Sequence, residues 1–277
     1  MLRSILIGLD GSNYSTAAID LGIRWAQRSG ATLIGMGIVD EPGILAPQMV
    51  ALEGGQYFFE ANNELVNDAR QRVEGFLDEF AQRCASEGVK CRLLEEVGSP
   101  DEQILNDTKP YDLIMLGRQT YFHFETQDRP DNTLRTVLRN SSRPVVTVPE
   151  NPPEGTSVVV AYNGSTEADR ALQAFLGLEL TDSEPVHVIS IDDNPETAQR
   201  WASQASAFLR IHDVQVQSHP LAIEGSVKDT ILARVRELNA HLLVMGAYGR
   251  SMWREVIFGS LTDSVLQESP VPLFLCH

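Results

Sequence analysis

The sequence has little positive charge, and lysine is the scarcest of its charged residues. Its 22 Lys and Arg residues stand against 38 Asp and Glu residues, giving a formal net charge of −16 at pH 7. The lysines are limited to Lys90, Lys109 and Lys228. Residues 1–150 carry 14 basic and 22 acidic side chains, and residues 151–277 carry 8 and 16, so neither half is basic. This balance argues against nucleic acid or an anionic membrane as the main partner, because phosphate groups would be repelled.

Cysteine and long apolar runs are also scarce. Cys84, Cys91 and Cys276 are an odd number without metal-ligand spacing, so we expect reduced, mostly buried thiols rather than a disulfide framework. No segment approaches the roughly 18 apolar residues of a membrane-spanning helix, and no signal peptide is recognised at the N-terminus. The six histidines show no pair at metal-ligand spacing, so no metal site is expected. These absences predict a soluble, cytoplasmic protein.

An internal repeat organises the chain. Four apolar or turn segments occur twice in the same order, with an offset of 153 residues at the first and 127 to 129 at the others. The extra residues of the first copy fall at about 42–64, a Pro- and Gly-containing stretch typical of a loop. We therefore predict domains at 1–150 and 155–277, joined by a short linker. The matched segments are 5–12 with 158–165, 98–105 with 225–232, 112–117 with 241–246, and 143–148 with 271–276.

Each copy alternates short apolar runs with amphipathic stretches. Continuous Val, Ile and Leu runs favour strands that are buried on both faces, and strand–helix alternation favours a parallel sheet. We predict an α/β fold with two tandem copies of an open, parallel five-stranded sheet that has helices on both faces. Capping boxes mark helix starts at Ser99-x-x-Glu102 and Ser226-x-x-Asp229. In the first copy the predicted strands are Ile5–Leu9, Thr32–Val39, Lys90–Glu95, Leu113–Leu116 and Val145–Val148, and helices are predicted at Ser15–Ser29 and Asn63–Glu87.

A glycine pattern in the second copy indicates a ligand site. Ligands of open α/β sheets gather beyond the carboxyl ends of the strands. Gly246 ends an apolar strand there, Gly249 follows, and Gly259-Ser260 precedes a predicted helix. Free N–H groups and the helix dipole at such a point suit a phosphate, and Arg250 adds positive charge. The alternative is that the glycines mark a strand exit and that Ser260 is only a helix N-cap.

The spacing of these residues resembles the G-x2-G-x9-G-(S/T) signature of the universal stress protein family, and the resemblance covers both copies. It implies a tandem member with a Rossmann-like, adenine-nucleotide-binding fold. It also implies that ATP, with or without magnesium, is bound in the second copy. The residues it assigns to the nucleotide are Gly246, Gly249, Arg250, Gly259, Ser260 and Leu261 at the phosphates, Asn163 at the adenosine end, and Ile191 at the adenine.

Each copy departs from the family pattern in its own way. Nucleotide-binding members usually have Asp at the tip of the first strand, where the second copy has Asn163. An amide still offers a donor and an acceptor. The first copy keeps Asp10 and Gly117 but has Asp131-Asn132 where the signature requires Gly-Ser. Glu125, Asp128 and Asp131 would also repel phosphate, so we expect a degenerate first site without ATP.

No dedicated catalytic machinery is recognised, because the sequence has no G-x4-G-K-(S/T) loop and no evident base for an attacking water. The leading interpretation is a regulatory nucleotide-binding protein. The alternatives are a nucleotide-free interaction or scaffold protein and a slow ATPase. The resemblance further implies that Val145–Val148 and Leu273–Cys276 pair within one chain as a pseudo-dimer, and it leaves homodimerisation of whole chains open. His123 is expected to be a surface or core residue. Tyr57-Phe58-Phe59, in the predicted loop, is a candidate surface for a partner or an apolar ligand.

Overall fold

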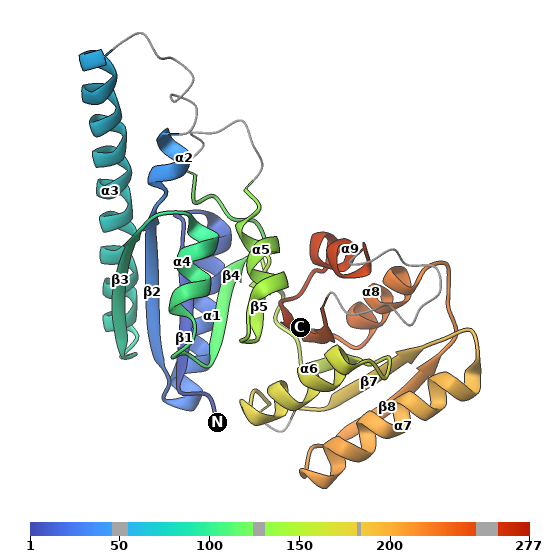
Figure 1. Ribbon diagram of the computed structural model, residues 1–277. Coiled ribbons are helices and arrows are strands. Elements are labelled where there is room, and N and C mark those ends of the chain that lie inside the picture. Colours follow the sequence, from blue (N-terminus) through green and yellow to red (C-terminus); the bar gives the residue numbers. More distant parts are fainter. Residues whose placement is uncertain (46–54, 124–130, 182–183, 248–259) are drawn as a thin grey trace. The chain divides into compact units, whose positions relative to one another are not determined.

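The protein is described by a computed structural model that covers residues 1–45, 55–123, 131–181, 184–247 and 260–277, except the side chains of 55–62 and 260 (Figure 1). The chain divides into two compact units. One consists of Arg3–Asn140, and the other of Ser141–His277 together with Met1–Leu2.

The unit Arg3–Asn140 contains four parallel strands in the order β3-β2-β1-β4. Its central strands are almost wholly buried, which explains their unbroken apolar sequences. Glycines on β2 allow α3 to lie close to the sheet, because a Cβ at Gly35 would lie 2.5 Å from the Phe80 ring. The elements are β1 (Ser4–Leu9), α1 (Asn13–Ser29), β2 (Thr32–Val39), α2 (Glu41–Leu45), α3 (Gly55–Ser86), β3 (Cys91–Val97), α4 (Pro100–Asp107), β4 (Leu113–Gly117) and α5 (Thr133–Asn140).

Two local predictions for this unit were wrong. Helix α3 begins at Gly55 rather than Asn63, so the second part of the stretch predicted as a loop is helical. Tyr57-Phe58-Phe59 therefore lies within α3, although its side chains are outside the described set. At α4, Ser99 is the N-cap residue and Pro100 follows it as predicted, but the expected side-chain cap is absent. The Ser99 hydroxyl instead donates to Asp101 Oδ1 over 2.6 Å.

The second unit contains six strands in the order β5-β10-β9-β6-β7-β8. The five strands of the second repeat, from β10 to β8, pair in parallel, which confirms the predicted sheet. The capping box at Ser226 is also confirmed, because its hydroxyl oxygen accepts from Asp229 N over 3.1 Å. The elements are β5 (Val145–Val148), β6 (Ser157–Ala161), α6 (Thr166–Gly177), β7 (Val186–Ile191), α7 (Pro195–Ile211), β8 (Val216–Leu221), α8 (Val227–Glu237), β9 (Ala240–Gly246), α9 (Ser260–Glu268) and β10 (Leu273–Cys276).

The last strands of the two repeats pair with each other, as predicted. β5 and β10 are antiparallel, with Val146 opposite Phe274 and Thr147 opposite Leu273. Because of this pairing, the boundary between the compact units follows Asn140 and lies before β5. The ring of Phe274 is fully buried and meets Phe175 of α6 edge to face, with 6.0 Å between ring centroids. The Phe274 ring thus packs β10 against α6, while strand pairing joins β10 to β5.

Replacement of Phe274 by Ala is expected to destabilise this unit strongly. The change removes a fully buried ring next to Phe175 and leaves a cavity, so we expect a loss of about 3–5 kcal/mol. Chemical denaturation measures the change in unfolding free energy. Ile211→Ala is the matched control, since its side chain is 78% exposed and its truncation should change stability little. Equal effects of the two substitutions would contradict the assigned packing.

Candidate functional site

In both repeats an aromatic side chain packs on the turn that follows the first strand. Gly11 and Gly164 have positive φ angles of 74° and 71°. A Cβ at Gly11 would lie 2.3 Å from the Phe76 ring, and one at Gly164 would lie 2.5 Å from Trp201 Nε1. Neither turn therefore accommodates a side chain, and the backbone beside Asp10 and Asn163 is held in place by packing.

Strand register brings three of the predicted nucleotide residues to one edge of the second sheet. Ala161 at the end of β6 pairs with Ile189 of β7 and with Met245 of β9. Asn163 lies two residues beyond Ala161, Ile191 two residues beyond Ile189, and Gly246 directly after Met245. All three residues are thus at the carboxyl ends of adjacent parallel strands, where such folds bind ligands.

The Asn163 side chain uses only part of its hydrogen-bonding capacity within the described residues. Its Oδ1 accepts a hydrogen bond from Ser165 N over 3.2 Å, and its side chain is half-buried. The Ser165 hydroxyl oxygen in turn accepts from Ala168 N and caps α6. Within the ranges that the structure describes, no residue accepts a hydrogen bond from Asn163 Nδ2. Among the described residues, the Asn163 amide therefore makes no hydrogen bond as a donor.

Gly246 has a packing role that the sequence did not reveal. A Cβ at this position would lie 2.6 Å from Ala168 N and 2.6 Å from Glu167 C, in the first turn of α6. Gly117 is similar in the first repeat, where a Cβ would lie 2.6 Å from Tyr14 Cβ in α1. In each repeat, the glycine at the end of the fourth strand therefore lets the first turn of a helix pack against it. This packing role does not depend on any ligand.

The remaining residues of the predicted phosphate loop are described only in part. Gly249, Arg250 and Gly259 lie outside the described residues. Ser260 is the first residue of α9, where the sequence predicts a helix to open, although its side chain is outside the described set. Leu261 follows in the first turn of α9 and is half-buried. The assignment of these five residues to phosphate stays a prediction.

The first repeat uses Asp10 for its own hydrogen bonds. Asp10 Oδ1 accepts from Ser12 N and from the Ser12 hydroxyl, over 2.9 and 2.6 Å. Asp10 Oδ2 accepts from Tyr121 N over 2.7 Å, which fastens the segment after β4 to the tip of β1. Burial raises the pKa of this carboxyl, against the effect of the same hydrogen bonds.

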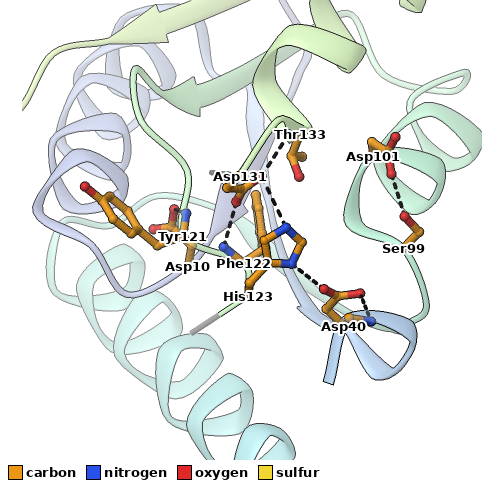
Figure 2. A network of polar contacts seen from close by, with 10 residues as sticks. Asp10, Asp40, Ser99, Asp101, Tyr121, Phe122, His123, Asp131 and Thr133 are labelled. Carbon is orange, nitrogen blue, oxygen red and sulfur yellow. Dashed lines mark hydrogen bonds and ion pairs between the residues drawn. The ribbon is translucent and has the colours of Figure 1, made fainter. Parts of the chain in front are cut away.

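A second carboxylate, Asp131, holds the same segment from its other side (Figure 2). Asp131 Oδ2 accepts from Phe122 N over 3.0 Å, and its Oδ1 accepts from Thr133 N, at the start of α5, over 2.8 Å. The Phe122 side chain is fully buried and lies where a Cβ on Gly8 would meet it at 3.0 Å. The sequence predicts only that Asp131 would repel phosphate, whereas the carboxylate also positions the chain.

His123 links Asp131 to the end of the second strand. Its Nδ1 is hydrogen-bonded to Asp40 Oδ2, and its Nε2 lies 3.9 Å from Asp131 Oδ1 (Figure 2). Asp40 follows β2 and also accepts from Gly43 N over 3.0 Å. We call Asp40, His123 and Asp131 the first-repeat latch. The hydrogen bond to Asp40 raises the pKa of His123, and the charges of Asp131 and Asp101 add to this effect, while burial opposes it.

The first-repeat latch was missed at the sequence level. His123 is the one histidine that the sequence places near a strand end, but Asp40 is far from it in the chain. The only available signal was that Asp40 follows a predicted strand, as Asp10 does. The two repeats therefore differ at the same edge. In the first, carboxylates of the chain accept backbone N–H groups, and in the second the Asn163 amide donates to no described residue.

Among the described residues, no group of three or more His, Cys, Asp or Glu side chains could hold a metal ion. In the same ranges, no helix is both long and apolar enough to span a membrane.

Comparison with known proteins assigns both repeats to one family. Residues 1–149 and residues 156–277 each match the sequence profile of the universal stress protein family. The universal stress protein Slr1230 of Synechocystis sp. is 23% identical over 290 residues, covering 98% of this chain and 99% of that protein. Rv1996 of Mycobacterium tuberculosis, also a universal stress protein, is 23% identical over 309 residues, covering 99% of this chain and 94% of that protein.

Solved structures show the same fold. A universal stress protein from Archaeoglobus fulgidus has a TM-score of 0.72 at 21% identity, covering 99% of this chain and 96% of that one. A protein from Pseudomonas aeruginosa UCBPP-PA14, described as a putative universal stress protein, has a TM-score of 0.59 at 17% identity, covering 99% and 93%. Both matches extend over the two repeats together.

The first-repeat latch is expected to stabilise the protein more at mildly acidic than at alkaline pH. The pKa of His123 is raised above its ordinary 6.5, so the stabilisation is complete below that value and is lost as pH rises through the folded-state pKa. His123→Asn removes the charge but retains a donor. We expect it to lower unfolding free energy clearly at about pH 6 and much less at about pH 9.

Denaturant unfolding of the parent and variant at both pH values measures this difference directly. His277→Asn, at an exposed residue outside the first-repeat latch, is the matched control and should change stability little. An equal loss for His123→Asn at both pH values would show that the imidazolium charge contributes nothing.

Proposed function

Because this chain belongs to the universal stress protein family, we propose that it is a regulatory protein that binds an adenine nucleotide in its second repeat. The nucleotide would be ATP, with or without magnesium. We assign it no catalytic residue, and the cytoplasmic location expected from the sequence is part of the same proposal.

The observation that carries the proposal is the strand register at the carboxyl edge of β9, β6 and β7. This register places Asn163, Ile191 and Gly246 at the carboxyl ends of three adjacent strands. The Asn163 side chain makes one hydrogen bond among the described residues, and its amide can both accept from and donate to ribose hydroxyls. The start of α9 at Ser260 supplies helix N–H groups and a positive dipole end, which suit phosphate.

The first repeat supports the choice of the second repeat as the site. Where the signature requires Gly259-Ser260, the first repeat has Asp131-Asn132. Asp131 accepts the N–H of Thr133 at the start of α5, so a carboxylate of the chain itself satisfies a helix N-terminus. Asp10 is likewise engaged by Ser12 and Tyr121. In the first repeat, a phosphate would therefore have to displace the Asp131 carboxylate from the helix N-terminus. At the corresponding position of the second repeat, Gly259 has no side chain to displace.

The proposed effect of nucleotide binding is a change in the conformation of the protein. The pairing of β5 with β10 supports a pseudo-dimer within one chain. A nucleotide that binds one conformation more tightly shifts the population toward it by its difference in affinity. Strand β5 continues from the first repeat and pairs in the sheet of the second, so main-chain hydrogen bonds connect the nucleotide-binding sheet to the first repeat.

The first test identifies the bound ligand and then measures how a substitution in the predicted site weakens its binding. Freshly purified protein is denatured, and released small molecules are identified by mass spectrometry. We expect about one adenine nucleotide per chain, or binding of added ATP with magnesium in calorimetry. Gly259→Asp would place a carboxylate at the predicted phosphate position, so we expect at least about tenfold weaker binding.

Gly75→Asp is the matched control, because a Cβ at Gly75 on α3 meets no atom within 4 Å. It should leave nucleotide affinity unchanged. Gly246 is not a suitable target, since any side chain there would collide with Glu167 and Ala168 and disturb folding. An empty protein that also fails to bind added nucleotide would favour the scaffold alternative, and equal affinities of the two variants would refute the assigned loop.

Asn163→Asp is expected to strengthen nucleotide binding. The carboxylate can accept charge-assisted hydrogen bonds from ribose hydroxyls, so we expect an affinity gain of about fivefold to tenfold in calorimetry. Asn239→Asp is the matched control, because it adds the same charge at an exposed position before β9, at the opposite edge of the same sheet. A gain that is equal in both variants, or absent from Asn163→Asp, would place the adenosine elsewhere.

A further inference from the structure

The inner face of α3 brings a cysteine toward the sheet. Val73, Leu77, Phe80 and Cys84 recur at intervals of three or four residues, so they share one face of the helix, and all are buried. A Cβ at Gly37 of β2 would lie 2.6 Å from Val73, and one at Gly35 would lie 2.5 Å from Phe80. The stripe therefore follows β2 toward its amino end, and Cys84 lies one turn of α3 beyond Phe80.

The register of β3 places a second cysteine at the same level. Gly35 pairs with Leu93, and Leu33 pairs with Cys91. Paired residues of parallel strands share a face, so Cys91 is on the face that α3 covers. The ion pair between Arg70 of α3 and Glu95 of β3, with 3.6 Å between Nε and Oε1, places α3 on that same face.

The connection between α3 and β3 is short and turns back tightly. Val89 N donates to Cys84 O over 2.9 Å, and Gly88 adopts a φ of 66°. The strand register and this short turn make Cys84 and Cys91 neighbours on one face of the sheet. Although the sequence predicts no disulfide framework, these two thiols are adjacent in the fold.

The two thiols differ in access. Cys84 is fully buried, and burial, followed by the neighbouring Cys91, raises the pKa of its thiol to about 12. Cys91 is half-buried and begins β3, which ends the strand order of its sheet. An oxidant in solution therefore reaches Cys91 first, and Cys84 is its buried neighbour.

We propose that Cys84 and Cys91 are a peroxide-oxidised pair that closes to an intramolecular disulfide. Hydrogen peroxide transfers one oxygen to Cys91 Sγ, giving a sulfenic acid and one water. Cys84 Sγ then attacks Cys91 Sγ, the S–O bond breaks, and a second water leaves with the Cys84 thiol proton. The two sulfurs are oxidised and the peroxide is reduced, so no further reactant is required. The disulfide joins the end of α3 to the start of β3 and is independent of nucleotide binding.

The test uses the full-length protein under native conditions, with hydrogen peroxide as oxidant and alkylation to count thiols. The three thiols of the reduced protein should fall to one. The intact mass should fall by two hydrogen atoms, and non-reducing digestion should yield a peptide joining Cys84 to Cys91. Cys276 belongs to the other compact unit and is an internal control that should remain reduced. Dithiothreitol should restore all three thiols.

Serine variants assign the two roles. Cys84→Ser should leave a sulfenic acid on Cys91 that dimedone traps, and Cys91→Ser should leave Cys84 unreacted at the same peroxide dose. Three thiols remaining in the treated parent would overturn the proposal. So would sulfinic acid at Cys91 without a cross-link, or a disulfide that joins two chains. Nucleotide binding plays no part in the readout, so failure here is distinct from failure of the proposed function.

Discussion

Main-chain hydrogen bonding between buried parallel strands is the constraint on which the rest of this structure depends. A buried strand must satisfy its backbone groups through its neighbours, and this requirement fixes the register. Once Ala161 pairs with both Ile189 and Met245, the residues that follow the three strands must emerge together. Strand pairing alone therefore brings these residues together at one edge of the sheet, where ligands of such folds bind.

The two repeats use the same edge in opposite ways. In the second, Asn163 retains donors and Gly259 has no side chain at the predicted helix start. In the first, Asp10 and Asp131 accept backbone N–H groups, and His123 lies between Asp40 and Asp131. In the first repeat, carboxylates of the chain itself accept the backbone N–H groups at this edge.

The sequence predicted the strands far better than the contacts between distant segments. Thr32–Val39 and Val145–Val148 were predicted with their observed limits, because short apolar runs bounded by turns have few alternative structures. The start of α3 was missed because Gly54-Gly55 was interpreted as part of a loop, whereas the helix begins at Gly55 itself. Local composition does not determine where a helix supported by tertiary packing begins.

The polar contacts of the first repeat were beyond sequence reasoning for a different reason. His123 and Asp40 are separated by 83 residues, and nothing local to either indicates the other. The packing role of Gly246 was hidden in the same way, since it depends on Glu167 and Ala168 in another element. Residues whose role is set by one neighbour in space become interpretable only when that neighbour is known.

The antiparallel pairing of β5 with β10 also bears on how the chain is made. Phe274 pairs with Val146, so a strand of the first repeat finds its partner only after the whole second repeat has been synthesised. Until then β5 lacks the partner on that side, and its four residues Val-Val-Thr-Val are strongly β-forming. A nascent or truncated chain without β10 would carry an apolar edge able to recruit other chains. Synthesis of β10 is therefore also the step that removes this aggregation hazard.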